Sequence, residues 1–297
     1  MYEIFDNTAD NEKIYRFFNE NTNYKVMQAS GPADTVCIFF SSNSLFLPST
    51  YSSFHSTIVD RDRYEWENLA KDPELSQIAG EFIFVRDIYK NWWLEGLCGK
   101  YNSQAKMLDL LRNLTSGKRV LTVGTSAGGY AAILFGVRLQ AERIYAFSSQ
   151  IDLHIYNRWH PIKHYSKYLD GTQNNAKLDL HFELQEYRGA LYYLYPSRCQ
   201  EDIEQAQYIY MQDCKETEHI RMMPVRRSKH GRTVLPISVL KFLSMSAEQA
   251  DKIYQHYRHK EINPYEFLFR TSGFLPGVRY LLGRMLKPLM SRIGRKR

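Results

Sequence analysis

The chain has 297 residues and a formal net charge of +7, with 44% hydrophobic and 24% charged residues. These proportions are typical of a chain that buries a core, and they exclude disordered and fibrous classes. The length fits one large α/β domain with additions as well as two domains.

The excess positive charge belongs to the C-terminal segment. Residues 277–297 contain seven basic side chains and no acidic one, and setting them aside leaves 32 basic residues against 32 acidic ones. The body of the protein is therefore neutral, and we expect no general nucleic-acid-binding surface.

Cysteine usage and the N-terminal residues indicate the compartment. The 4 cysteines stand apart with no C-x-x-C pair, and no histidine pair has metal-ligand spacing, so we expect no metal site. Residues 1–21 are polar and mixed in charge, unlike a secretion signal, and no run of about 18 apolar residues occurs. We expect a reduced, cytoplasmic protein.

Apolar runs typical of buried strands alternate along the chain with helical patterns. The expected strands are 35–40, 82–85, 120–123, 143–147, 190–195 and 220–225. The expected helices are 103–114, 127–139, 201–211 and 236–244. Continuously apolar strands require a sheet that is covered on both faces, and the alternation indicates a mostly parallel, doubly wound sheet. The predicted fold class is therefore α/β, with a mostly parallel central sheet flanked by helices.

One long stretch, residues 151–188, falls outside this alternation and is rich in His, Tyr and Asn. We interpret it as an insertion over the edge of the sheet, which is either a lid or substrate-binding segment or a helical excursion without a function. The expected organisation is a domain at 1–260 that contains this insertion, followed by a basic C-terminal extension at 261–297.

The motif that carries chemistry is Gly-Thr-Ser-Ala-Gly-Gly at 124–129, which contains G-x-S-x-G. The pattern alone is weak, but here it follows an apolar strand and opens a helix, as a nucleophile elbow does. Small residues must flank Ser126 because its backbone is strained and the strand and helix approach closely. The main-chain N–H of Ala127 then points at any oxyanion formed there. The alternative is a plain glycine-rich turn that could bind a phosphate.

A serine hydroxyl needs a base, and in proteins with this elbow the chain order is serine, acid, histidine. His230 lies in a polar loop after a late strand and is the expected base; the alternative is a surface histidine in a basic loop. The acid is expected in the loop after 190–195, where Asp202 or Glu201 could fix the imidazole. Asp202 is preferred, although either carboxylate could instead complement the dipole of its helix.

A second oxyanion donor is expected in the loop that follows the strand at 35–40. A main-chain N–H of Ser41 or Ser42 would complete the oxyanion hole with that of Ala127. The alternative is a simple Ser/Asn turn.

Several segments together resemble a known family. They are Phe-Phe-Ser-Ser at 39–42, Phe-Val-Arg-Asp at 84–87 with two tryptophans at 92–93, the elbow, Phe-Ser-Ser-Gln at 147–150, Asp202, and Lys-His-Gly at 229–231. Over about residues 30–245 the chain resembles bacterial α/β-hydrolase-fold O-acetyltransferases that modify capsular polysaccharides. The C-terminal extension departs from that pattern. We expect Arg86 and Asp87 to be structural, because an Arg–Asp pair at a strand end usually orders a loop.

The resemblance implies an α/β-hydrolase-like fold and a triad of Ser126, Asp202 and His230. It also implies acetyl-CoA as co-substrate, with no bound cofactor, an acetyl-serine intermediate, and a hydroxyl of a capsular or surface polysaccharide as acceptor. Two alternatives stay open: an esterase or thioesterase with the same triad, and a non-catalytic glycan-assembly protein. The sequence identifies neither the sugar nor the oligomeric state.

Basic residues beside the expected base, Arg226, Arg227 and Lys229, could hold the phosphates of CoA or an anionic polymer. A solvated basic loop is the alternative.

In residues 277–297, apolar residues recur at three- and four-residue spacing with basic residues between them, which indicates an amphipathic cationic helix. Gly283 and Pro288 weaken it. We expect this helix to attach the protein to the anionic inner face of the cytoplasmic membrane. A docking helix for a partner and a solvated end are the alternatives.

Overall fold

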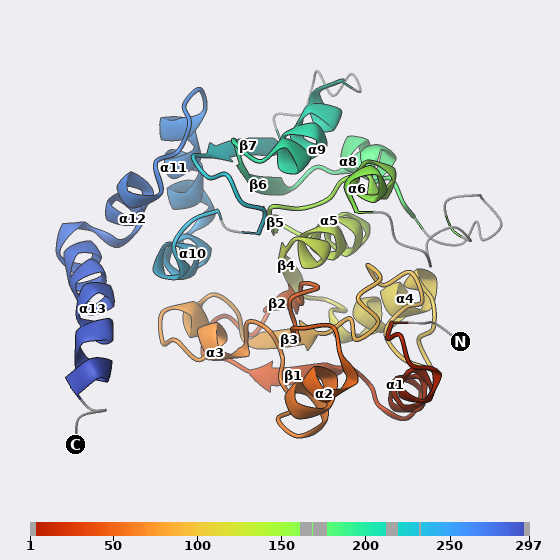
Figure 1. The fold of residues 1–297 in the computed structure, drawn as a ribbon. Helices are drawn as coiled ribbons and strands as arrows, with labels where there is room; N and C mark the ends of the chain where they lie inside the picture. Colours follow the sequence, from red (N-terminus) through yellow and green to blue (C-terminus); the bar gives the residue numbers. More distant parts are fainter. Residues whose placement is uncertain (1–3, 161–167, 169–176, 212–218, 232, 294–297) are drawn as a thin grey trace.

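A single sheet organises the molecule. The computed structural model describes residues 4–160, 168, 177–211, 219–231 and 233–293. Within these ranges, seven strands lie in the order β1-β3-β2-β4-β5-β6-β7, and every pair is parallel except β1 with β3 (Figure 1). Their bounds are β1 Tyr24–Gln28, β2 Thr35–Phe40, β3 Glu81–Val85, β4 Arg119–Thr125, β5 Arg143–Phe147, β6 Ala190–Pro196 and β7 Ile220–Val225.

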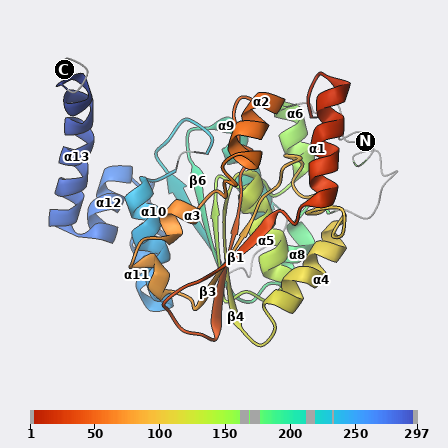
Figure 2. The ribbon, with the colours of Figure 1, turned by 90° about the horizontal axis from the view of Figure 1, so that it is seen from below.

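Helices cover both faces of the sheet, as the strand–helix alternation predicts. One face packs against α4, α5 and α8, and the other against α3, α10 and α11 (Figure 2). The helices are α1 Thr8–Glu20, α2 Tyr51–Phe54, α3 Glu67–Ala70, α4 Gln104–Leu114, α5 Ala127–Arg138, α6 Leu153–Trp159, α8 His181–Glu186, α9 Gln200–Met211, α10 Pro236–Leu243, α11 Ala247–Tyr257, α12 Pro264–Ser272 and α13 Phe274–Ile293.

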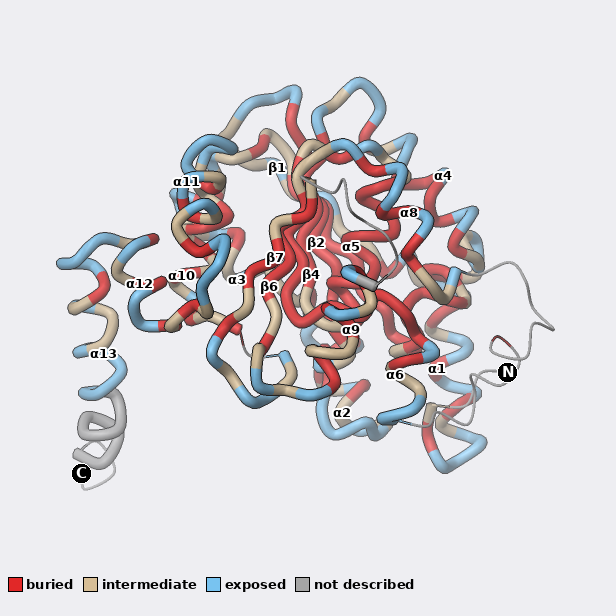
Figure 3. The backbone as a smooth tube through the Cα atoms, turned by 90° about the horizontal axis from the view of Figure 1, so that it is seen from above, coloured by how far each residue is buried: buried red, intermediate tan, exposed pale blue. Residues whose placement is uncertain are grey.

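Burial along the strands follows from this layering. All six residues of β2 are buried, and Figure 3 shows the central strands buried along their length. Such strands have apolar residues at consecutive positions because neither face meets water. The edge strand β1 is half-buried, and its mixed sequence, Tyr-Lys-Val-Met-Gln, explains why the apolar-run criterion missed it.

The carboxyl ends of the parallel strands meet at one edge of the sheet, which is where α/β proteins form their sites. There, the loops after β2 and β3 rest on a small apolar cluster of their own. In that cluster Phe18 of α1 stacks on Tyr89 with ring centroids 4.2 Å apart. The cluster holds both loops in place beside the end of β4.

The predicted C-terminal extension consists of two unlike parts. Helix α12 packs on the body, because Phe267 is fully buried and its ring centroid lies 5.6 Å from that of Phe242. The predicted boundary at residue 260 therefore does not separate α12 from the core. Helix α13 projects from the body (Figures 1 and 2). None of the helices in the described part of the chain contains an apolar stretch that could span a bilayer.

The predicted insertion at 151–188 contains α6 and α8 and joins β5 to β6. Its residues 161–167 and 169–176 lie outside the described residues. The interpretation as a lid stays a prediction.

Candidate active site

The predicted elbow forms between β4 and α5. Ser126 has φ +55° and ψ −123°, a conformation that is strained for any residue with a Cβ and that occurs at nucleophile elbows. The glycines allow the turn to close: a Cβ at Gly124 would lie 2.0 Å from the main-chain oxygen of Gly128, and a Cβ at Gly128 would lie 2.4 Å from that of Phe40. No larger residue fits at either position without moving backbone.

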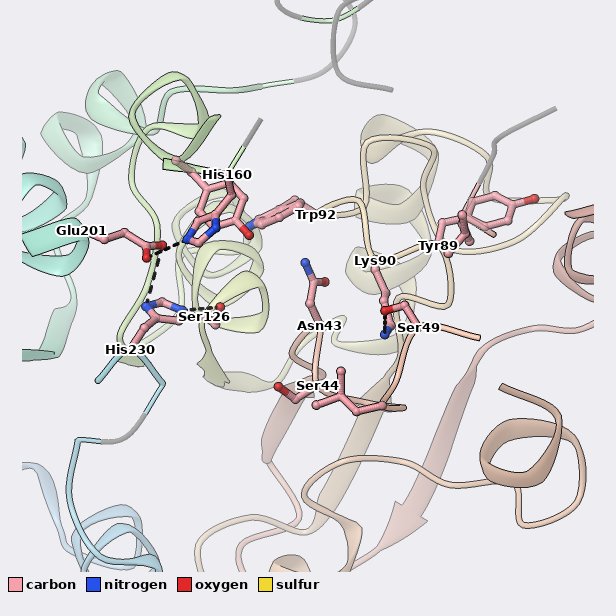
Figure 4. A pocket seen from close by; sticks show the side chains of 13 residues that line it. Asn43, Ser44, Ser49, Tyr89, Lys90, Trp92, Ser126, His160, Glu201 and His230 are labelled. Atoms are coloured by element: carbon pink, nitrogen blue, oxygen red, sulfur yellow. Dashed lines mark hydrogen bonds and ion pairs between the residues drawn. The ribbon is translucent and has the colours of Figure 1, made fainter. Parts of the chain in front are cut away.

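Three side chains from separate elements meet at this elbow. The Oγ of Ser126 lies 2.8 Å from Nε2 of His230, in the loop after β7 (Figure 4). The Nδ1 of His230 lies 3.1 and 3.2 Å from the two carboxylate oxygens of Asp202, in the first turn of α9. A proton on Nδ1 that is donated to Asp202 leaves Nε2 to accept the hydroxyl proton. The structure thus brings together all three residues that the sequence nominates for the triad.

The charges around His230 prepare it to take a proton. Burial lowers the pKa of this imidazole, but the hydrogen bond to Asp202 and the negative charges of Asp202 and Glu201 outweigh burial, so the pKa is raised above its usual value. The carboxylate of Asp202 is itself almost fully buried, which strengthens its field at the imidazole. The arrangement favours the protonated form of His230, as a base that accepts a proton from Ser126 would require.

The two candidate acids have different partners. The Oε1 of Glu201 lies 4.0 Å from Nδ1 of His230, beyond hydrogen-bonding distance, and its Oε2 lies 3.0 Å from Nε2 of His160. Asp202 therefore holds the base, and Glu201 holds a second histidine at the mouth of the site. The sequence does not nominate His160, because it precedes the acid in chain order and no local pattern around it indicates its position.

The expected second oxyanion donors do not face the site. The N–H of Ser41 donates to the main-chain oxygen of Val85 at 3.0 Å, which extends the pairing of β2 with β3, and that of Ser42 donates to Oε2 of Glu65 at 2.5 Å. This corrects the expectation for Ser41 and Ser42, since both N–H groups already have acceptors. Ala127 keeps the predicted position, because its N–H lies in the first turn of α5, where no helical acceptor exists.

A pocket of about 530 Å³ opens over Ser126 and His230. Asn43, which follows the two serines, lies in its wall, and its Oδ1 has no hydrogen-bond partner among the described residues. The walls combine a few polar groups with apolar surface (Figure 4), a typical composition of small-molecule sites. The other lining residues are Ile4, Ser44, Leu47, Ser49, Tyr89, Lys90, Trp92, Tyr156, His160 and Glu201.

The predicted cofactor-binding residues lie outside the lining of this pocket. Arg226 pairs with Glu261 at 2.6 Å, and the Nε of Arg227 donates to the main-chain oxygen of Thr233 at 3.1 Å. Lys229 is exposed. Their binding of CoA or of a polymer stays a prediction.

Two sequence segments that carry the family resemblance meet beside the pocket. The indole N–H of Trp92 donates to Oε1 of Gln150 at 3.1 Å across 58 positions of the chain. Asp87 accepts main-chain N–H groups of its own loop, and burial raises its pKa to about 6. Arg86 is buried and pairs with Asp62 at 2.7 Å. Asp87 and Arg86 order the loops that form the pocket wall.

Comparisons with known proteins bear on the fold. No protein-family model matches the sequence, and the search of curated proteins found no match. The structure is similar to the capsule O-acetyltransferase of Neisseria meningitidis serogroup A in complex with caged gadolinium, with a TM-score of 0.51 and 14% identity, covering 79% of this chain and 92% of that one. A histidine-to-alanine mutant of that enzyme in complex with CoA gives a TM-score of 0.51 and 13% identity, covering 79% and 93%. At this identity the likeness shows the fold alone. The chain has an α/β-hydrolase-like fold, which confirms the predicted fold class.

Proposed function

We propose that the protein is an O-acetyltransferase that moves an acetyl group from acetyl-CoA, through an acetyl-Ser126 intermediate, to a hydroxyl of a bacterial capsular or surface polysaccharide. The observation that carries this proposal is the hydrogen-bonded series of Ser126, His230 and Asp202 at the floor of a pocket. The likeness in fold to a capsule O-acetyltransferase, solved also as a mutant with CoA, supports the choice of donor and acceptor.

His230 accounts for the reaction by taking up and then returning one proton in each of its two halves. As Ser126 Oγ attacks the thioester carbonyl, Nε2 of His230 takes the hydroxyl proton, and the imidazolium then returns it to the departing thiolate. The N–H of Ala127 donates to the oxyanion that forms in this step. In the second half, Nε2 takes the proton of the sugar hydroxyl while that oxygen attacks acetyl-Ser126, and the proton returns to the serine.

Transfer requires that the acceptor hydroxyl compete successfully with water for the acetyl-serine. The pocket supplies an apolar contact for a sugar, because the partly exposed ring of Tyr156 lies in its wall and packs on the buried ring of Trp92, with centroids 4.7 Å apart. Aromatic rings present apolar faces to the C–H groups of a sugar ring. These contacts support a saccharide acceptor over simple hydrolysis.

The fate of the acetyl group distinguishes this proposal from an esterase or thioesterase. Purified protein is incubated with acetyl-CoA, with and without an acetyl-free capsular polysaccharide, and both free acetate and polymer-bound acetate are measured. A transferase places acetate on the polymer and releases thiol faster when the polymer is present. Acetate release at one rate, with or without polymer, indicates a hydrolase. A Ser126→Ala protein that still supports acetylation of the polymer in cells indicates a non-catalytic assembly protein.

We further propose that α13 attaches the protein to the inner face of the cytoplasmic membrane. Its exposed side chains are both apolar and basic, and Leu282, Arg284 and Met285 are examples. A helix of this composition lies in the interface of an anionic bilayer, with each basic residue near the surface contributing about 1 kcal/mol. The acceptor polymer would then reach the pocket at the membrane where it is assembled.

A further inference from the structure

One ammonium group faces the pocket from the side opposite the triad. Lys90 lies in the loop after β3, and Figure 4 shows it across the pocket from Ser126 and His230. Its Nζ donates to the main-chain oxygen of Phe46 at 2.6 Å and to Oγ of Ser49 at 2.9 Å. An ammonium group has three N–H donors, so one is left for a ligand.

This cation has no carboxylate partner among the described residues. Burial lowers the pKa of Lys90 to about 8, and the charge of Asp87 partly offsets that effect, so the side chain is still protonated at neutral pH. The carboxylate of Asp87 already accepts main-chain N–H groups of the loop. A partly desolvated cation without a counter-ion is costly, and an anion that binds beside it offsets the cost.

The loop holds this ammonium in one place. Lys90 has φ +52°, in the left-handed region that side chains with a Cβ rarely adopt, and Trp92 and Trp93 share this feature with φ +56° and +55°. Such conformations cost of order 1 kcal/mol each and persist where the surroundings enforce them. The Nζ also lies 3.8 Å from the centroid of the Phe46 ring. The position of the charge is therefore fixed before any ligand arrives.

The opposite end of the pocket carries a negative group. The side chain of Glu201 is only 9% exposed, and its Oε1 has no hydrogen-bond partner among the described residues. Glu201 disfavours an anionic group at its end of the pocket and Lys90 favours one at the other, so the charges favour the orientation that places the anion at Lys90. That orientation turns the remainder of the substrate towards Ser126.

We propose that Lys90 forms an anion subsite, which binds a carboxylate or phosphate group of the substrate that reacts at Ser126. The role of Ser126 in this statement rests on the proposed function. The anion belongs either to the donor, since CoA carries phosphates, or to an acidic sugar of the acceptor. The subsite sets substrate preference and takes no part in the proton transfers.

Two small esters test the subsite. Wild-type protein, Lys90→Gln and Lys90→Arg are assayed on 4-acetoxybenzoate, which is an anion, and on its neutral methyl ester. The ratio of kcat/KM for the anion to that for the neutral ester should fall about tenfold or more in Lys90→Gln, as expected for one lost charge-assisted hydrogen bond, and return towards wild type in Lys90→Arg. An equal loss on both esters overturns the subsite, because it assigns Lys90 to ordering the loop at Phe46 and Ser49. Lys106→Gln, which removes an exposed lysine of α4, is the matched control and should leave the ratio unchanged.

Further substrates identify the source of the anion. Acetyl-CoA is compared with acetyl-pantetheine, which lacks phosphates, and an acidic sugar acceptor with a neutral one. A selective loss of activity on acetyl-CoA in Lys90→Gln assigns the anion to the donor, and a selective loss on the acidic acceptor assigns it to the acceptor.

Calorimetry of 4-hydroxybenzoate binding tests the subsite separately, because it requires no reaction at Ser126. If wild-type protein cleaves neither ester and forms no acetyl-serine from acetyl-CoA, the proposed function fails, while weaker binding of 4-hydroxybenzoate by Lys90→Gln still supports the subsite and equal binding refutes it.

Discussion

The carboxylate of Asp202 lies 3.1 Å from Nδ1 of His230, while that of the adjacent Glu201 lies 4.0 Å from the same atom. Both residues belong to the first turn of α9. Consecutive side chains on a helix point about 100° apart, so only one of the two carboxylates can accept a hydrogen bond from Nδ1 of His230. Glu201 instead reaches His160. The two carboxylates therefore have separable effects.

Substitution of each carboxylate by its amide tests this separation. Asp202→Asn removes the acceptor that orients the imidazole, and kcat should fall about 10³- to 10⁴-fold. Glu201→Gln leaves that hydrogen bond in place, and kcat at its pH optimum should fall less than about tenfold. Steady-state hydrolysis of p-nitrophenyl acetate measures both, with circular dichroism as the folding control. A larger loss in Glu201→Gln than in Asp202→Asn would reverse the assignment of the acid.

The pH dependence of kcat/KM reports the charges near His230. The base must be neutral to act, and its pKa is raised by Asp202 and Glu201 in spite of burial. Activity should therefore rise with pH through a midpoint above the usual histidine value. Glu201→Gln removes one negative charge, which lowers the pKa of the imidazole, so the acid limb should move to lower pH. If the acid limb stays in place or moves to higher pH, the charge of Glu201 does not raise the pKa of His230.

A pair of glycine substitutions tests the packing of the elbow. A Cβ at Gly128 would lie 2.4 Å from the main-chain oxygen of Phe40 and 2.8 Å from that of Ser41. Gly128→Ala should lower the free energy of unfolding by about 1–3 kcal/mol, the usual cost of overpacking, and should also lower activity because Ser126 moves. Gly283→Ala on α13 meets nothing within 4 Å and should be neutral or slightly stabilising. Thermal and urea unfolding measure both. Equal effects of the two changes would show that the elbow has more room than the structure gives it.

The sequence predicts the buried parts of this molecule better than its pocket. Strands such as Thr35–Phe40 are continuously apolar because both faces are covered, so their bounds can be read from composition alone. The triad is predictable because strand order places the ends of β4, β6 and β7 at one edge. The residues of the pocket walls cannot be predicted in this way, because Lys90 and His160 reach the site through loop conformations that depend on distant contacts. The prediction of Ser42 as an oxyanion donor was wrong for the same reason, because its N–H donates to the carboxylate of Glu65, which lies in another segment.

Deletion of residues 277–297 tests the proposed membrane role of α13. The deletion removes seven basic residues, and each contributes about 1 kcal/mol near an anionic surface. Sedimentation with vesicles should show binding of the full chain to phosphatidylglycerol-containing vesicles and its loss in the truncated chain. Vesicles of phosphatidylcholine alone are the control for charge, and activity on a soluble acceptor should be retained. If the truncated chain sediments with the vesicles as the full chain does, α13 does not attach the protein to the membrane.

Mass spectrometry of the protein after brief exposure to acetyl-CoA determines whether Ser126 carries the acetyl group. Without an acceptor, the acetyl group should accumulate on the peptide that contains Ser126, and added polysaccharide should discharge it. Ser126→Ala should show no adduct at this peptide, whereas His230→Ala should form it far more slowly. A wild-type protein that consumes acetyl-CoA and acetylates the polymer without any adduct at Ser126 would contradict the account.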